Sequence, residues 1–181
     1  MMRKKPMLAY PVSSKPIDYT NKISMQPKLD GVRCVIQYEG KSSVDPRVVA
    51  YSRTGKQWKN IEHICMQLKP FFKKYPDVIL DGELYNHDLR NDFEQIISIV
   101  RRQKPDDIDM LNSREMVQFH CYDAIDELVK FNNRHLWLTK FVPESYCVKH
   151  VKTQAVPTES LSKVVHQQNL DAGYEGSILR L

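Results

Sequence analysis

Hydrophobic and polar positions along the first half of the chain follow first a strand pattern and then a helical one. Residues 32–38 and 47–52 are rich in β-branched and aromatic types, and Gly40 opens a turn after the first run, which predicts a hairpin of two strands. From 58 to 75 the apolar residues fall three or four positions apart, so this segment predicts one helix that Pro76 closes.

The second half of the chain continues with alternating strand and helix signals. Further strands are predicted at residues 78–85, 117–125 and 174–181, with an extended segment over 146–156. Further helices are predicted from Asn91, which resembles an N-cap with Glu94, to about Gln103, at 134–141, and from the N-cap Thr158 to about Leu170, with Gly173 as C-cap. Adjacent strands interspersed with helices favour an α+β domain of antiparallel sheets over a doubly wound parallel one.

Residues 104–115 interrupt this pattern with charge. They contain Pro105 and the run Asp106-Asp107-Ile108-Asp109. The aspartates could be interpreted as a metal site, but the composition favours a solvated loop.

Composition places the chain among globular proteins with one domain. Of 181 residues, 41% are hydrophobic and 27% charged, and the net charge of +5 is compatible with a polyanionic partner without establishing one. The four cysteines form no C-x-x-C pair and no zinc spacing with the histidines, which predicts free thiols in a reducing compartment. Neither a secretory signal nor a membrane-length apolar run is present, so we expect an intracellular protein, cytoplasmic or nuclear, that is not secreted.

The segment Lys28-Leu29-Asp30-Gly31-Val32-Arg33 presents an unusual set of groups at the start of a predicted strand. A bare Asp-Gly turn with a solvated lysine would be the ordinary interpretation. Here an amine, a carboxylate, a glycine that allows close backbone approach and a guanidinium occur together, and this set suits attack on a phosphate. A nucleophilic lysine needs desolvation or cationic neighbours, and phosphoryl transfer needs positioning and charge stabilisation.

Three other segments carry more polar groups than a core strand needs. Taken singly, each has an ordinary interpretation as an edge or core strand. They are Leu80–Tyr85 with Asp81 and Glu83, Phe119–Ile125 with Tyr122 and Asp123, and Tyr174–Arg180 with Glu175 and Arg180.

In this order the four segments resemble the covalent nucleotidyltransferases: ATP-dependent DNA ligases, RNA ligases and mRNA capping guanylyltransferases. The resemblance covers nearly the whole chain and includes Ser52-Arg53-Thr54-Gly55 after the hairpin. Pro6-Met7-Leu8-Ala9, which is similar to the leader of DNA ligases, and the Leu and Val that flank Asp30-Gly31 favour the DNA ligases. The resemblance implies two packed, mainly antiparallel sheets flanked by helices, as in the adenylation domain of these enzymes.

The resemblance also implies a role for each matched residue. Lys28 would attack the α-phosphate of ATP, hold AMP as lysyl-AMP, and pass it to the 5′-phosphate of a nick in double-stranded DNA. Gln26, where DNA ligases often have Glu, would accept a hydrogen bond from the adenine 6-amino group. The remaining assignments are Arg33 and Glu83 at the ribose and phosphates, Arg53 at the ribose or the nick phosphate, Tyr122 stacked on adenine, and Glu175 with Glu83 as ligands of Mg²⁺ or Mn²⁺.

The family continues with a Lys-x-Lys strand and an oligonucleotide-binding barrel, and residues 1–181 contain neither. The resemblance therefore implies an adenylation domain truncated before these parts, which by itself would be weakly active or inactive. It implies nicked DNA as partner and a monomer, and does not distinguish DNA replication, repair and recombination. Arg180 stands where the family more often has lysine and receives no role. An RNA ligase, a capping guanylyltransferase and an inactive nucleotide- or nucleic-acid-binding domain remain alternatives.

Overall fold

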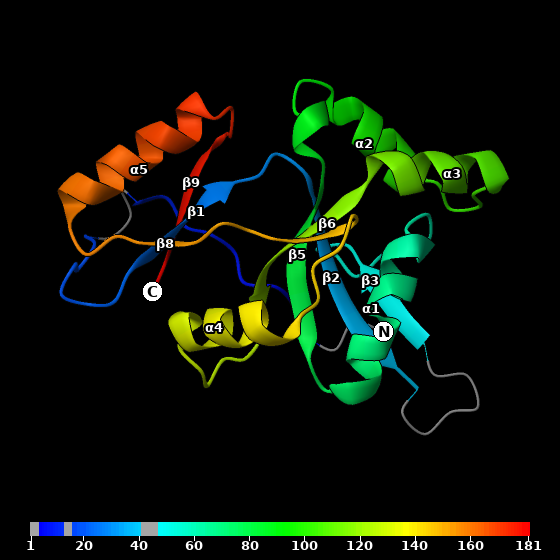
Figure 1. Ribbon diagram of the computed structural model, residues 1–181, viewed down its shortest axis with the longest axis horizontal. Coiled ribbons are helices and arrows are strands. Elements are labelled where there is room, and N and C mark those ends of the chain that lie inside the picture. The colour runs from blue at the N-terminus through cyan, green and yellow to red at the C-terminus, as the bar shows by residue number, and fades with distance from the viewer. Residues whose placement is uncertain (1–3, 13–15, 41–46) are drawn as a thin grey trace.

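The larger of two sheets in the structure has six strands (Figure 1). The structure is a computed structural model that describes residues 4–12, 16–40 and 47–181. All neighbouring strands of this sheet are antiparallel except β6 and β7, which are parallel. In spatial order they are β4 (Gln57–Trp58), β3 (Arg47–Tyr51), β2 (Val32–Glu39), β5 (Ile79–Tyr85), β6 (Gln118–Ala124) and β7 (Val148–His150).

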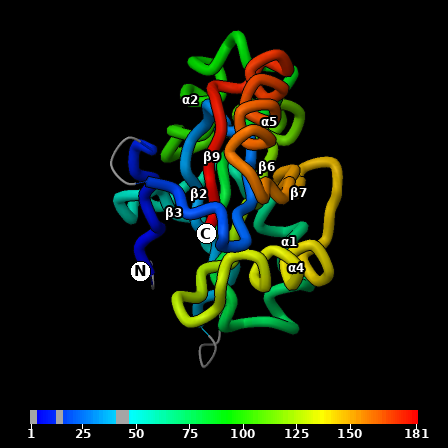
Figure 2. Tube along the Cα trace, turned by 90° about the vertical axis from the view of Figure 1, so that its left-hand side faces the viewer, coloured from blue at the N-terminus to red at the C-terminus, as the bar shows by residue number. Residues whose placement is uncertain are grey.

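The smaller sheet pairs the first strand of the chain with the last. Its order is β8 (Gln154–Ala155), β1 (Ser24–Lys28) and β9 (Gly176–Arg180), and both pairings are antiparallel. Helix α5 (Glu159–Asp171) packs on β1 and β9, and Figure 2 views the molecule from this side. A small core lies under α5, formed by Ile23, Met25, Val156 and Val165.

The other helices flank the larger sheet. They are α1 (Glu62–Lys74), the 3₁₀ turn η2 (His87–Leu89), α2 (Phe93–Val100), α3 (Asp107–Met116) and α4 (Phe131–Phe141). Helix α1 packs on β2 and β3, and its apolar stripe, predicted from the sequence, is buried at Ile64, Leu68 and Phe72. The mainly antiparallel sheets and flanking helices confirm the predicted fold class. Within the described residues no helix is long and apolar enough to cross a membrane.

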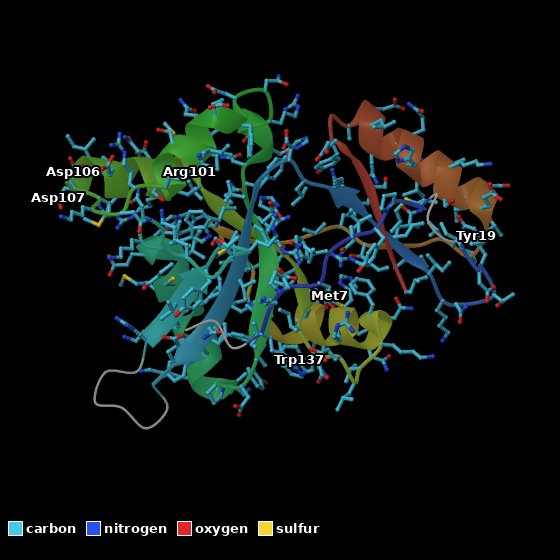
Figure 3. The ribbon with its side chains drawn as sticks, turned by 180° about the vertical axis from the view of Figure 1, so that it is seen from behind. Met7, Tyr19, Arg101, Asp106, Asp107 and Trp137 are labelled. Carbon is cyan, nitrogen blue, oxygen red and sulfur yellow. The ribbon has the colours of Figure 1, made fainter. Side chains whose placement is uncertain are left out.

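The prediction that residues 104–115 form a loop is wrong, because α3 occupies most of this segment. Asp106 is its N-cap: the side chain accepts a hydrogen bond from the backbone N of Asp109 at 2.7 Å, and the Asp109 carboxylate accepts one from the backbone N of Asp106 at 3.4 Å. This capping box satisfies free backbone donors and places negative charge at the positive end of the helix dipole. Figure 3 shows Asp106 and Asp107 at that end.

Three helix starts also differ from the predictions. Helix α1 begins at Glu62 and not at 58, because Trp58 belongs to β4. Helix α2 begins at Phe93 with Asp92 as N-cap, which makes no side-chain cap, so the predicted capping box of Asn91 and Glu94 is wrong. Helix α4 begins at Phe131, three residues before the predicted start at 134, whereas Thr158 caps α5 as predicted by accepting from the backbone N of Leu161. The segment 146–156 is extended in parts, because it contains β7 and β8.

The two Asp-Gly pairs contain glycine because the backbone passes too close to its neighbours for a side chain. A Cβ on Gly31 would lie 2.5 Å from Cγ of Glu83 and 2.6 Å from the carbonyl oxygen of Leu84. A Cβ on Gly82 would lie 2.5 Å from the carbonyl oxygen of His120 and 2.5 Å from the Phe119 ring. The close approach predicted at Gly31 is confirmed, and Gly82 lets β5 and β6 approach beside the polar residues that they carry.

Gly82→Ala is expected to lower the free energy of unfolding by about 1–3 kcal/mol, because the added methyl must displace backbone and a buried ring. Urea titration measures this change. Gly176→Ala is the matched control, since its Cβ would meet only Cε1 of His166, at 3.7 Å. Equal stability of the two variants would contradict the close packing of β5 against β6.

Candidate active site

Lys28 is the last residue of β1 and lies opposite Gly176 of β9. Its ammonium donates a hydrogen bond to Oε1 of Glu175, and the backbone N of Glu175 donates to the carbonyl oxygen of Lys28 at 3.2 Å. Both side chains are about half exposed, at 44% and 45%. The strand pairing therefore brings the predicted nucleophile and one predicted metal ligand together, although 147 positions separate them in the sequence.

Arg33 lies on β2 and pairs with Asp81 of β5. Its Nε and Nη2 donate to the two carboxylate oxygens at 2.7 and 2.5 Å, and Nη2 also donates to the carbonyl oxygen of Met7 at 2.9 Å. Burial raises the pKa of Asp81, which is 1% exposed, while Arg33 opposes this increase. Figure 3 shows Met7 near the middle of the molecule, so the segment predicted to be a ligase leader reaches the site through its backbone.

Tyr122 of β6 lies between the two sheets in this network. The guanidinium carbons of Arg33 and Arg180 lie 5.1 and 5.0 Å from its ring centroid, within the range of cation–π interactions. Its hydroxyl donates to Oε2 of Glu83 at 3.4 Å. The residue is only 8% exposed, so an adenine ring could stack on it only after a neighbouring side chain moves.

Gln26 is 1% exposed, and partners from three other segments engage its amide. Oε1 accepts from Nε of Arg180 at 2.8 Å, and Nε2 donates to the carbonyl oxygen of Tyr122 at 3.1 Å and to Oγ1 of Thr153 at 2.9 Å. An amide oxygen has two lone pairs, so one acceptor position of Gln26 is left beside the bond from Arg180. Arg180 and Thr153 thus belong to the site although the sequence analysis gave neither a role.

Arg180 could have been found from the sequence by one signal. It is a charged residue that follows Ile178 and Leu179 in a strand, and a partly buried charge requires partners. The partners are Gln26 and the rings of Tyr122 and Phe131, the latter 5.4 Å from the guanidinium carbon. Thr153 gives no such signal, because a threonine between β7 and β8 is unremarkable until the fold places it against Gln26.

Arg33, Glu83 and His120 are register partners across β2, β5 and β6. Burial raises the pKa of Glu83 to about 8, against the lowering effect of Arg33. Burial also lowers the pKa of His120 to about 4, with a further contribution from the charge of Lys149. Near neutral pH the free protein therefore holds Glu83 mostly protonated and His120 uncharged.

His120 makes stability depend on pH. Its pKa falls from 6.5 to about 4 on folding, so between these values the unfolded chain binds a proton that the folded chain does not, and stability is lost as the pH falls. We expect this group to contribute up to about 3 kcal/mol of acid destabilisation. Urea unfolding from pH 7 to pH 4 should show a smaller loss for His120→Gln than for the wild type. His166→Gln, on the exposed side of α5, is the control, and parallel curves for wild type and His120→Gln would contradict the assignment.

The carboxylates predicted to bind a metal do not form a complete site by themselves. Within the ranges that the structure describes, no three His, Cys, Asp or Glu side chains are grouped so that they could hold an ion. Glu175 is paired with Lys28, and Glu83 with the Tyr122 hydroxyl. One or two carboxylates nevertheless fit Mg²⁺, which usually completes its shell with water and substrate phosphates.

Arg53 stands apart from the other predicted residues. It is exposed in the turn between β3 and β4, where Oγ of Ser52 accepts from the backbone N of Lys56 at 3.0 Å. Among the described residues, no hydrogen bond or ion pair joins Arg53 to the network around Tyr122. The structure thus connects Gln26, Arg33, Glu83 and Tyr122, and separately pairs Lys28 with Glu175.

Similarity to known proteins shows which family the chain belongs to. The profile of the family described as ATP dependent DNA ligase domain matches residues 6–181. The chain belongs to this family. DNA ligases of African swine fever virus are relatives: over 161 residues the chain is 28% identical to those of the Pretoriuskop and Namibian warthog isolates and 27% to that of a Kenyan pig isolate. The match covers 86% of this chain and 36% of each viral ligase, so this ligase-family domain spans about a third of those relatives.

Solved structures confirm the fold of this ligase-family domain. A Chlorella virus DNA ligase-adenylate matches 98% of the chain at a TM-score of 0.67 and 17% identity, over 60% of its own length. A Lig E DNA ligase, from work on DNA binding with a minimal scaffold, matches 98% at 0.70 and 19% identity, over 62% of its length. An archaeal ATP-dependent RNA ligase matches 98% at 0.62 and 16% identity, over 45% of its length. Together with the family match, this fold confirms the sequence-based assignment to the ATP-dependent DNA ligases.

Proposed function

We propose that this domain takes AMP from ATP onto Lys28 and passes it to the 5′-phosphate of a nick in double-stranded DNA. In the first step the Nζ–P bond forms, the bond from the α-phosphorus to the bridging oxygen breaks, and pyrophosphate leaves. The observation that carries the proposal is the position of Lys28, at the end of β1 beside Glu175, in a chain whose family is that of ATP-dependent DNA ligase domains.

The neighbours of Lys28 suit this reaction. Glu175 fixes the ammonium at the end of β1, and the amine must lose its proton before it can attack. Mg²⁺ or Mn²⁺, when bound, supplies positive charge to the phosphates and to the developing pyrophosphate. Glu175 and Glu83 would hold that ion, because carboxylate oxygens are the ligands that Mg²⁺ prefers.

The network around Tyr122 suits the nucleoside. Adenine would stack on Tyr122 once a guanidinium moves from the ring, with Gln26 as acceptor for its 6-amino group. Arg33 and Glu83 would contact the ribose and phosphates. Arg53, exposed and outside the network, would meet the ribose or the nick phosphate, and the net charge of +5 suits a DNA partner. We propose a monomer that acts inside the cell in DNA replication, repair or recombination.

Incubation with ATP or GTP and Mg²⁺, followed by intact mass measurement, tests this function. The reaction is followed under single-turnover conditions for long times, and a gain of one AMP is expected with ATP. A gain of GMP would indicate a capping guanylyltransferase. No adduct with either nucleotide would contradict the proposed reaction.

A further inference from the structure

A pocket of about 260 Å³ lies beside the candidate active site, and no role proposed so far uses it. The end of β1, strands β6 and β7 and the segment before β9 form its walls. Its lining includes Pro27, Leu29, His120, Lys149, Lys152 and Tyr174. Pro27 and Leu29 flank Lys28, and Tyr174 precedes Glu175, so the walls are continuous with the segments that carry the proposed chemistry.

The pocket is nevertheless separate from the α-phosphate that Lys28 would attack. Successive side chains of a strand point to opposite faces, so Pro27 of β1 points away from the face that presents Gln26 and Lys28. A group bound against Pro27 is therefore not the group that receives the Lys28 amine.

The charge of the pocket favours an anion. Lys149 is partly exposed and Lys152 exposed, and neither ammonium has a hydrogen-bond or ion-pair partner among the residues that the structure describes. The imidazole of His120 is neutral near neutral pH because burial lowers its pKa to about 4, so it adds polarity without charge. Glu144 is the one carboxylate in the lining, and it accepts a hydrogen bond from the backbone N of His150 at 2.9 Å.

The wall that carries Tyr174 is firmly held. Its ring packs on His87 with the ring centroids 4.5 Å apart. Nδ1 of His87 lies 2.6 Å from the hydroxyl of Tyr85, and Nε2 lies 3.1 Å from the carbonyl oxygen of Ala172. These contacts tie the segment before β9 to the end of β5 and position the wall that carries Tyr174.

We propose that this pocket binds a backbone phosphate of the DNA substrate through Lys149 and Lys152. The inference rests on the proposed function for its choice of polyanion, and it adds a contact on the face of β1 opposite Lys28. Lysines at the mouth of a pocket contact phosphates as point charges, and such contacts position a duplex without reading its sequence. Each phosphate neutralised releases counterions, which gives the contact a measurable dependence on salt.

Fluorescence anisotropy with a labelled nicked duplex over a series of salt concentrations tests the proposal. The double variant Lys149→Gln/Lys152→Gln is expected to reduce the slope of log K against log salt by about 0.9, the contribution of the one phosphate contact that the two lysines make. The matched control is Lys69→Gln/Lys73→Gln, which removes two charges from the exposed side of α1 and is expected to change the slope by less than half as much.

The AMP adduct provides the second readout. Its yield should be the same for the pocket variant and the wild type, because the pocket lies away from Lys28. A loss of adduct in the pocket variant would show that the lysines serve the nucleotide and would overturn the proposal. Equal slopes for pocket and control variants, or no binding of the wild type at low salt, would overturn it too. If the wild type forms no adduct but the salt slopes of the pocket and control variants differ, the result supports the phosphate contact in the pocket and contradicts the proposed reaction of Lys28.

Discussion

Lys28→Ala is expected to form no AMP adduct under conditions in which the wild type does. The variant removes the amine that would form the Nζ–P bond, and the cations of the network around Tyr122, Arg33 and Arg180, are guanidiniums that cannot replace it. Guanidinium stays protonated at all relevant pH values and is not a nucleophile. Intact mass after incubation with ATP and Mg²⁺ measures the loss.

Two controls make that result specific to Lys28. Lys56→Ala removes an exposed lysine after the β3–β4 turn and should leave the adduct at the wild-type level. Lys28→Ala itself should unfold within about 0.5 kcal/mol of the wild type, because its half-exposed ion pair with Glu175 contributes little stability. A Lys28→Ala protein that still gains AMP would show that another residue is the nucleophile.

Arg134→Met is expected to lower the free energy of unfolding by about 3–5 kcal/mol, the cost of leaving a buried charge unpaired. Asp123 is 1% exposed, and its two oxygens accept from Nε and Nη2 of Arg134 at 2.8 and 2.7 Å. Arg134 also donates to the carbonyl oxygens of Asp126 and Val129, so it closes the loop between β6 and α4. Chemical denaturation measures the change.

The exposed pair of Lys163 and Glu159 on α5 is the control for this prediction. Its side chains are 74% and 65% exposed, so Lys163→Met should cost less than about 0.5 kcal/mol. The double variant Asp123→Asn/Arg134→Met should recover part of the stability lost in Arg134→Met, because no charge then remains buried. Arg134→Met within 1 kcal/mol of the wild type would contradict the assigned pairing.

The spacing of residues along the sequence predicted the features that depend on interactions between neighbours in the chain. The stripe of helix α1 and the hairpin of β2 and β3 follow from the spacing of apolar residues. Gly31 follows from the need for close backbone approach after Asp30. The aspartates at the start of α3 were assigned to a loop, because a charged run is typical of a loop unless its spacing is tested for a helix cap.

The contacts between the site residues could not be predicted from patterns of neighbouring residues in the sequence. Arg33 pairs with Asp81, 48 positions away, and Gln26 meets Arg180, 154 positions away, because strands distant in sequence pair side by side. The burial of Arg180 depends on the antiparallel pairing of β9 with β1 and on the Tyr122 ring of the other sheet. The sequence was enough to identify the motif residues. Their contact partners could be identified only from the three-dimensional fold.

These partners change the picture of nucleotide binding. In the free protein Arg33 and Arg180 lie over Tyr122, and Arg180 holds one acceptor position of Gln26. An adenine ring bound as proposed would therefore replace contacts that the protein already makes to itself. With the proposed adenine site, the affinity for ATP would be reduced by the cost of moving these side chains, which is the usual cost of a binding-competent state that must first form.

Peptide mapping of the adduct tests the central claim most directly. The wild type is incubated with ATP and Mg²⁺, digested under conditions that preserve the phosphoramidate, and analysed by tandem mass spectrometry. The account predicts AMP on Nζ of Lys28, in a peptide that trypsin does not cleave after Lys28. AMP on any other residue, or a chain that stays unmodified, would contradict it.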